Sequence, residues 1–307
     1  MAKQSIRILT SSRDRVGECP VWSVTEQALY WVDIEGCRIH RFDWASETQQ
    51  TWYTSERVGC VALTDRREPR TLVAAMETGI FLLKLGESLD VDATLLAGVK
   101  HPTPNMRFND GRCDAQGRFW VSSLCMDMSL AAPVGAVYCF DEAGLSEPQI
   151  TGLVTPNGMG FSPDGGAYYL SDSHPTVQKI WVWDRDAQTG VLSQQRLFVD
   201  MLVLPGRPDG AAVDVDGCYW ICANDAGLVH QFSAQGKLLK SVSVPVSKPA
   251  MCAFGGPNLD VLFVTTILPA GVLPEQTGLN GAVFAIDVGA RGQPEPVFSC
   301  FSSFSLC

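Results

Sequence analysis

The sequence of 307 residues lacks the features that would place it in several large classes of protein. It contains no uninterrupted apolar stretch of the roughly 18 residues needed to span a bilayer. Its first residues, MAKQSIRILTSSRD, carry positive charge but no apolar segment typical of a secretion signal follows them. There is no basic run, and 23 Lys and Arg against 33 Asp and Glu give a formal net charge of −10. We therefore expect a cytoplasmic protein with neither nucleic acid nor membrane as a partner.

Cysteine is present, but not in patterns that indicate disulfides or zinc. None of the 11 cysteines forms a Cys-x-x-Cys pair, and no Asn-x-Ser/Thr glycosylation site occurs. Such spacing does not resemble the disulfide framework of a secreted protein. We expect most of the cysteines to be small buried thiols, including Cys218 and Cys222, which would share one face of a strand.

Several familiar catalytic motifs are also missing. The chain has no Gly-x-Ser-x-Gly elbow, no His-Glu-x-x-His pair, no phosphate-binding P-loop and no Gly-x-Gly-x-x-Gly turn. Its four histidines are isolated in the sequence. His174 follows Ser-Asp-Ser and is expected near other polar residues, where a lone histidine is usually a hydrogen-bonded loop residue. Any catalytic site must therefore be assembled from other residue types.

A repeated phrase is the strongest positive feature. A polar turn, a short apolar segment, a second turn and an aromatic-rich strand recur along the chain, and 46% of the residues are hydrophobic, enough for a large core. Five copies occupy residues 17–34, 108–124, 156–172, 208–225 and 249–266. A sixth, more divergent copy contains Gly59. Further strands are expected at 38–43, 135–141, 179–184, 228–233 and 281–287.

These repeats predict an all-β fold, a six-bladed β-propeller. Repeats of about 40–50 residues with about four strands each are typical of propeller blades around a central channel. Strands such as ALYWVDI at 28–34 do not alternate between apolar and polar residues, so both faces of each sheet must be covered. No linker is apparent, and we expect one domain over residues 1–307. We expect the ring to be closed by pairing of strand 5–10 with strand 295–300.

In such a ring, residues at the same position of successive repeats meet at one mouth of the channel. Those residues are Glu18, Asn109 followed by Asp110, Asn157 and Asp209. An Asn or Asp before glycine can simply form a turn, which is the alternative for each single copy. Glu18 is not explained in that way. Two carboxylates and an amide at one mouth favour a divalent cation held by oxygen ligands.

The same segments resemble the SMP-30/gluconolactonase/LRE-like family, which includes regucalcin and bacterial sugar lactonases. The motifs that carry the resemblance are GECPVW at 17–22, ALYWVDI at 28–34, RFNDGRCDAQGRFW at 107–120, PNGMGFSPDG at 156–165 and RPDGAAVDVDGCYW at 207–220. The resemblance implies a six-bladed propeller with one catalytic divalent metal ion in the channel. It implies that Glu18, Asn157 and Asp209 bind the metal and that Arg107 and Asn109 contact the substrate.

The chain departs from the family pattern in two places. Cys19 follows the glutamate where the family usually has glycine. In the segment SSLCMDMSL, where members often place an acidic residue that touches the sugar, the nearest counterpart is Asp127. Asp127 is therefore the third predicted substrate-binding residue. Arg107 has an alternative structural role, a salt bridge between blades.

The resemblance implies a metal-dependent lactonase that opens a glucono-, galactono- or arabinolactone to the sugar acid, and the residues are consistent with that chemistry. Asp209 is the predicted general base, because a carboxylate beside a Lewis-acidic cation can take the proton from water. Oxygen ligands of this kind suit Ca, Zn, Mn or Mg. The alternatives are a non-catalytic propeller that binds calcium or a partner protein, and an organophosphate or luciferin-type hydrolase. A monomer or weak homo-oligomer is expected.

Overall fold

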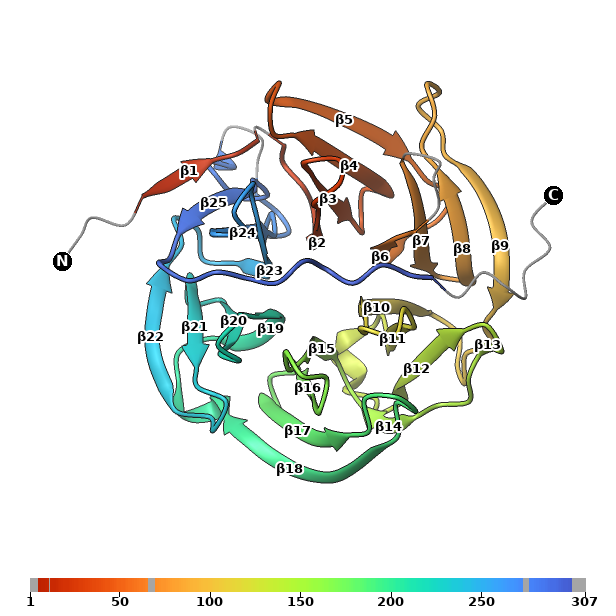
Figure 1. Ribbon diagram of the computed structural model, residues 1–307, viewed down its shortest axis with the longest axis vertical. Helices are drawn as coiled ribbons and strands as arrows, with labels where there is room; N and C mark the ends of the chain where they lie inside the picture. Colours follow the sequence, from red (N-terminus) through yellow and green to blue (C-terminus); the bar gives the residue numbers. More distant parts are fainter. Residues whose placement is uncertain (1–4, 11, 66–69, 273–275, 300–307) are drawn as a thin grey trace.

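The computed structural model describes residues 5–10, 12–65, 70–272 and 276–299. Its strands form six sheets arranged around a central channel, so the prediction of an all-β six-bladed propeller is confirmed (Figure 1). Strands are antiparallel to their neighbours within each blade. No helix within the described ranges is long and apolar enough to cross a membrane.

Each blade takes its strands in chain order from the channel outward, apart from the last blade, which also receives the N-terminal strand. Blade 1 contains β2 (Gly17–Ser23), β3 (Ala28–Asp33), β4 (Arg38–Asp43) and β5 (Thr48–Tyr53). Blade 2 contains β6 (Val58–Leu63), β7 (Thr71–Met76), β8 (Gly79–Lys84) and β9 (Asp92–Gly98). Blade 3 contains β10 (Met106–Cys113), β11 (Phe119–Cys125), β12 (Gly135–Asp141), β13 (Gly144–Leu145) and β14 (Ile150–Leu153). Blade 4 contains β15 (Pro156–Phe161), β16 (Ala167–Asp172), β17 (Lys179–Arg185) and β18 (Leu192–Asp200). Blade 5 contains β19 (Arg207–Val213), β20 (Tyr219–Asn224), β21 (Leu228–Phe232) and β22 (Leu238–Ser243). Blade 6 contains β23 (Pro249–Gly255), β24 (Val261–Thr266), β25 (Phe284–Asp287) and β1 (Ile6–Ile8).

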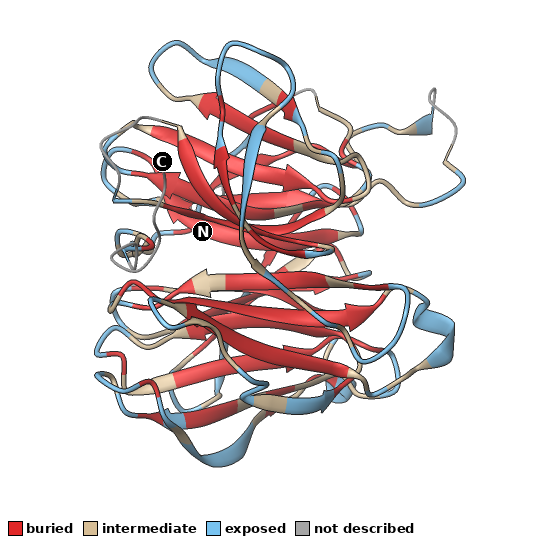
Figure 2. Cartoon of the chain, turned by 90° about the vertical axis from the view of Figure 1, so that its right-hand side faces the viewer, coloured by how far each residue is buried: buried red, intermediate tan, exposed pale blue. Residues whose placement is uncertain are grey.

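Burial explains why the inner strands are apolar on both faces. All residues of β3, β7, β11 and β20 are buried, because each inner strand packs between the neighbouring blades. The outermost strands β5, β9, β18 and β22 are mostly exposed (Figure 2). Each of the six innermost strands contacts the innermost strands of both neighbouring blades, so the ring is continuous.

A buried aspartate holds the turn after the innermost strand in two blades. Asp114 accepts a hydrogen bond from the Trp120 indole at 2.9 Å, and Asp214 accepts one from Trp220 at 2.8 Å. Both aspartates also accept backbone N–H groups of their own turns. The polar residues of the second turn in these repeats are therefore structural, since they satisfy buried donors.

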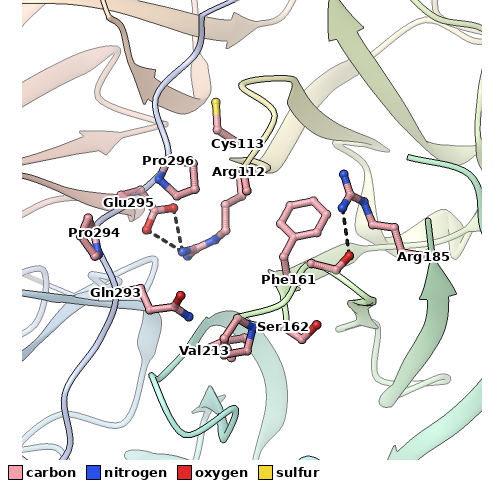
Figure 3. Close-up of a pocket in the computed structure, with 14 residues that line it drawn as sticks. Arg112, Cys113, Phe161, Ser162, Arg185, Val213, Gln293, Pro294, Glu295 and Pro296 are labelled. Carbon is pink, nitrogen blue, oxygen red and sulfur yellow. Dashed lines mark hydrogen bonds and ion pairs between the residues drawn. The ribbon is translucent and has the colours of Figure 1, made fainter. Parts of the chain in front are cut away.

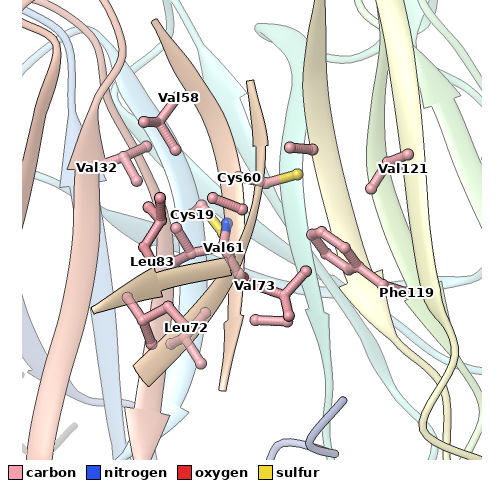
Figure 4. Packing of buried hydrophobic residues seen from close by; sticks show 14 of the residues in the cluster. Cys19, Val32, Val58, Cys60, Val61, Leu72, Val73, Leu83, Phe119 and Val121 are labelled. Atoms are coloured by element: carbon pink, nitrogen blue, oxygen red, sulfur yellow. Dashed lines mark hydrogen bonds between the residues drawn. The ribbon is translucent and has the colours of Figure 1, made fainter. Parts of the chain in front are cut away.

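Cysteines contribute to packing, as expected. All cysteines of the described residues are free thiols, and all but Cys37 and Cys218 are buried. Cys19 lies between blades 1 and 2, where its sulfur contacts the backbone N and O of Val61 at 3.2 and 3.4 Å (Figure 4). Its backbone has φ of 47°, in the left-handed region that favours glycine. This explains why glycine suits this position, and why cysteine here requires a compensating fit.

The predicted ring closure is wrong in its C-terminal partner. The N-terminal strand β1 does complete blade 6, but it pairs with β25, with Ile6 opposite Ile286 and Ile8 opposite Phe284. Residue 300 of the predicted partner lies outside the described residues, and the segment before it runs elsewhere. β25 was available as a partner because its edge is the free edge of blade 6.

Residues 288–299, the C-terminal strap, leave blade 6 and cross the channel (Figure 1). The strap pairs with the ends of several blades: Val215 N–H donates to Arg291 O, Gly292 N–H to Leu259 O and Phe298 N–H to Leu63 O. These contacts lie at the C-terminal ends of innermost strands or in the turns that follow blade strands. The strap therefore covers the mouth opposite to the one where the innermost strands begin.

Candidate functional site

A β-bulge interrupts every innermost strand near its start. The register shifts lie between Glu18 and Val21, Val58 and Cys60, Phe108 and Gly111, Asn157 and Gly160, Pro208 and Ala211, and Pro249 and Cys252. Bulges bend a strand and re-aim its side chains. The predicted site residues Glu18, Asn109, Asn157 and Asp209 lie within or directly beside these bulges. The position that recurs in the sequence repeats therefore coincides with a β-bulge in the structure.

A hydrogen-bonded chain joins blades 3 and 4 at this mouth. Arg107 Nη1 donates to Asn109 Oδ1 at 2.7 Å, and Asn109 Nδ2 donates to Asn157 Oδ1 at 2.8 Å. Asn109 Nδ2 also donates to Pro156 O at 2.9 Å, which fixes the orientation of the amide. The structure therefore places two predicted substrate-binding residues in line with one predicted metal ligand.

Glu18 and Asp209 lie near the starts of the innermost strands of blades 1 and 5, and the charge of Asp209 acts on Glu18. Burial raises the pKa of Glu18 well above its ordinary value, and the charges of Asp209 and Asp110 raise it further. Burial also raises the pKa of Asp209 to about 7, although a hydrogen bond from Asn224 opposes the shift. These shifts mean that both carboxylates lack sufficient compensating positive charge in the protein alone.

Asp110 adds a third carboxylate below this pair. It is 5% exposed, its Oδ2 accepts the Met159 N–H at 2.8 Å, and its Oδ1 is buried without a hydrogen-bond partner in the described part of the chain. Burial raises its pKa to about 6. Asp110 follows Asn109 directly, and alternation along a strand gave no reason to expect both side chains to contact blade 4. They do so within the bulge between Phe108 and Gly111.

Arg107 has no carboxylate partner among the residues that the structure describes. Its Nη1 contacts only the Phe108 carbonyl and Asn109, and its Nε is buried without a partner among the described residues. By contrast, Arg57 pairs with Glu35 at 3.0 Å and Glu77 at 2.9 Å. Within the described ranges the alternative role of Arg107 in a salt bridge between blades is not found, and its unused donors are free to bind a ligand.

Asp127 lies apart from this hydrogen-bonded group. It is exposed and caps the short 3-10 helix η1 (Met128–Leu130), where its Oδ1 accepts from Ser129 N at 3.1 Å and Ser129 Oγ at 2.6 Å. The loop is tied to blade 4 because the His174 ring contacts Met128 O at 3.2 Å. Substrate contact by Asp127 stays a prediction, and His174 is a hydrogen-bonded loop residue.

The donor set fits a hard divalent cation. Among the described residues, no group of three or more His, Cys, Asp or Glu side chains is gathered at metal-binding distances. The candidate set instead combines the carboxylates of Glu18 and Asp209 with the amide of Asn157. Oxygen-only sets of this kind suit Ca²⁺, Mg²⁺ or Mn²⁺. A bound cation would stabilise the ionised forms of these two carboxylates, whose pKa values are raised by burial.

One residue of the site was missed in the sequence. Asn224, the last residue of β20, donates from Nδ2 to Asp209 Oδ2 at 2.7 Å. The signal that could have found it is the repeat itself. Asn224 pairs with the first residue of the innermost strand of its blade. The residues that do so in blades 1 and 4 are Asp33 and Asp172, so blade 5 has an amide where these blades have an acid.

A second cavity lies at the opposite mouth, beneath the strap. It has a volume of about 90 Å³ and is lined by residues of blades 3 to 5 and by Gln293–Pro296 (Figure 3). Arg112 reaches Glu295 there, with its Nη1 2.8 and 2.9 Å from the two carboxylate oxygens. Glu295 neutralises Arg112 in this cavity, whereas Arg107 at the other mouth has no ion-pair partner among the described residues.

Comparison with known proteins matches the chain over most of its length. The family described as SMP-30/Gluconolactonase/LRE-like region matches residues 16–268. The chain is 35% identical over 302 residues to 6-deoxy-6-sulfogluconolactonase of Pseudomonas putida, covering 96% of this chain and 99% of that protein. It is 36% identical over 288 residues to pentonolactonase XacC of Haloferax volcanii, covering 92% and 94%.

Solved structures give the same fold. The luciferin-regenerating enzyme superposes with a TM-score of 0.88 at 25% sequence identity, covering 97% of this chain and 100% of that chain. The similarity therefore extends over nearly the whole chain.

Proposed function

Since the chain belongs to the SMP-30/gluconolactonase/LRE-like family, we propose that it is a metal-dependent lactonase that opens a sugar-derived lactone to the sugar acid. The observation that supports this proposal is that Glu18, Asn157 and Asp209 all lie at or beside the bulges near the starts of innermost strands. Asn157 is joined through Asn109 to Arg107, whose Nε is buried without a partner among the described residues. The relatives named above act, by their names, on six-carbon and five-carbon sugar lactones. We expect a five- or six-carbon aldonolactone here.

Glu18, Asn157 and Asp209 would hold one divalent cation, with Ca, Zn, Mn and Mg all compatible with these oxygen ligands. When bound, the cation would polarise the lactone carbonyl and stabilise the negative charge that develops on its oxygen. The neutral amide of Asn157 limits the negative charge of the ligand set. With two carboxylates, the set balances the two charges of the cation.

Asp209 supplies the base. Its carboxylate takes a proton from a water molecule as the water oxygen bonds to the lactone carbonyl carbon. When the tetrahedral intermediate collapses, the bond from that carbon to the ring oxygen breaks, and Asp209 returns the proton to the ring oxygen. One water is consumed, and the products are the carboxyl and hydroxyl groups of the open-chain acid. Asp209 is 6% exposed, which keeps bulk water from competing.

Arg107 and Asn109 orient the substrate. The free guanidinium donors of Arg107 suit the hydroxyl oxygens of a polyol, while Asn109 holds Arg107 and Asn157 in fixed positions. Asp127 stands on a loop at the same mouth of the channel, where a further hydroxyl contact is proposed.

The deciding experiment is a panel of aldonolactones assayed with purified protein before and after dialysis against a chelator. We expect hydrolysis that is lost on chelation and restored by one of Ca, Zn, Mn or Mg. Full activity in metal-free protein would end the proposal of Lewis-acid catalysis. Metal binding without turnover of any lactone would favour the non-catalytic calcium-binding alternative, and turnover of a phosphotriester alone would favour the organophosphate-type hydrolase.

A further inference from the structure

Asn224 is bound to the site through a single contact. Its amide lies opposite Arg207 in the pairing of β19 with β20, and its Nδ2 is 2.7 Å from Asp209 Oδ2. Asn224 is 1% exposed and Asp209 is 6% exposed, so water does not compete for this hydrogen bond. An ionised carboxylate can only accept, so the NH₂ group of the amide must face Asp209.

The same position has a different task in other blades. Asp33 accepts from the backbone N–H groups of Val16 and Gly36, at 3.0 and 3.2 Å. Asp172 accepts from Val154 and Thr155, at 2.7 and 3.0 Å. In those blades the side chain therefore holds the connection between strands. In blade 5 the equivalent side chain turns to Asp209 instead.

Stability does not account for an asparagine at this position. Asn224 Oδ1 is buried and has no hydrogen-bond partner in the described part of the chain, which is unfavourable for folding. An aspartate would face Asp209 with a second acceptor, and an apolar residue would leave Asp209 Oδ2 without its donor. The Asn224 amide donates to the Asp209 carboxylate, while its own oxygen has no partner among the described residues.

We propose that Asn224 is a positioning residue that fixes Asp209 through Oδ2 and leaves the other carboxylate oxygen to the cation and the attacking water. The inference rests on the proposed function. Groups that orient a metal ligand in this way typically change metal affinity or activity by about 10–100-fold when they are removed. Arg107 and Asn109 lie on blade 3 and are not part of this contact.

The test is Asn224→Leu, which keeps the approximate size and removes the donor, with Asn224→Ser as a second variant in case the first does not fold. The matched control is Thr266→Val. Thr266 lies opposite the first residue of β23 in blade 6, is fully buried, and donates to Ala282 O at 2.6 Å. Each protein is titrated with Mn²⁺ by calorimetry and then assayed for lactone hydrolysis at saturating metal.

We expect a dissociation constant for Mn²⁺ about 10–100-fold higher in both Asn224 variants, a lower kcat, and an unchanged KM. Thr266→Val should lose thermal stability but keep metal affinity and kcat. Asn224 variants that bind Mn²⁺ and turn over like an active wild type would overturn this inference alone. A wild type that neither binds metal nor hydrolyses lactones would overturn the proposed function, and this inference with it.

Discussion

At the residue scale, the candidate site depends on which blades carry a carboxylate and which carry an amide near the start of the innermost strand. Where innermost strands begin, blades 1 and 5 carry the carboxylates Glu18 and Asp209, while blade 4 carries the amide Asn157. Behind Asp209, Asn224 again replaces an acid by an amide. Each amide reduces repulsion between buried carboxylates whose pKa values are already raised by burial.

Replacing Asp209 by asparagine should separate its two roles. Asp209→Asn keeps an oxygen that can hold the cation but removes the group that takes the proton. General-base catalysis contributes about 10²–10⁴-fold, so kcat at saturating metal should fall by at least about 10². The measurement is kcat as a function of metal concentration. If turnover stayed near normal at saturation, the base would have to be another group, with Asp110 or Asp127 next.

Glu18→Gln is the matched comparison for that experiment. It changes a proposed metal ligand to which no proton transfer is assigned, so we expect mainly weaker metal binding. Excess metal should restore much of its kcat, unlike that of Asp209→Asn. Equal and unrecoverable losses in both variants would mean that the two carboxylates act as one unit.

Arg107→Ala should affect the substrate rather than the metal. A hydrogen bond from a charged donor contributes about 1.5–3 kcal/mol, so KM for a hydroxylated lactone should rise by about 10–100-fold. Metal content, measured by elemental analysis after gel filtration, should not change. Loss of metal from this variant would show that the contact from Arg107 through Asn109 to Asn157 supports the ligand set itself.

At the scale of elements, the starts of the innermost strands form one mouth of the channel, and the C-terminal strap covers the other. Bulges at the start of the innermost strands direct polar side chains into one mouth. The strap covers the other mouth, with Glu295 paired to Arg112 and Phe298 fully buried against Phe140 at a ring distance of 5.3 Å. The strap is expected to stabilise the ring without touching the chemistry.

Phe298→Ala tests this division. Removing a fully buried phenylalanine costs about 3–5 kcal/mol, so the melting temperature should drop by several degrees. At temperatures where the variant is folded, kcat and KM should stay within about twofold of the wild type. Leu197→Ala, on an exposed part of β18, is the control and should change neither quantity. A large loss of kcat in folded Phe298→Ala would show that the strap is coupled to the site.

At the scale of the whole molecule, a net charge of −10 and several buried carboxylates make stability depend on pH and metal. Asp209 has a pKa of about 7 in the metal-free fold but about 3.9 when unfolded. Between these values the folded state binds more protons than the unfolded state. The contribution of Asp209 to the free energy of unfolding therefore falls as pH rises from about 4 to about 7.

The measurement is the melting temperature of chelator-treated wild type and Asp209→Asn from pH 5 to pH 7.5. The wild type should lose stability relative to the variant as pH rises, and added metal should reduce that loss. The difference between wild type and variant is needed because half-buried His101 and buried His230 have lowered pKa values, which make stability rise with pH. A difference that is flat or rises with pH would contradict the raised pKa of Asp209.

Much of this molecule follows from repetition in the sequence. Spacing and strand pattern predicted six blades, and the strands expected at 38–43 and 135–141 have the observed bounds. The position of Glu18, Asn157 and Asp209 within their repeats placed them at one mouth, because every four-stranded blade returns the chain to the same face. Local pattern was sufficient here because the same unit is folded six times.

Only the tertiary structure decided which strands and side chains pair with each other across the ring. A strand pattern does not name its partner, so the pairing of β1 with β25 and the course of the strap could not be read from residues 5–10 and 295–300. The same holds for Asn224. Its contact with Asp209 depends on a bulge in β19 that shifts the register against β20, and it is that shift, rather than either residue alone, that brings an amide to a buried carboxylate.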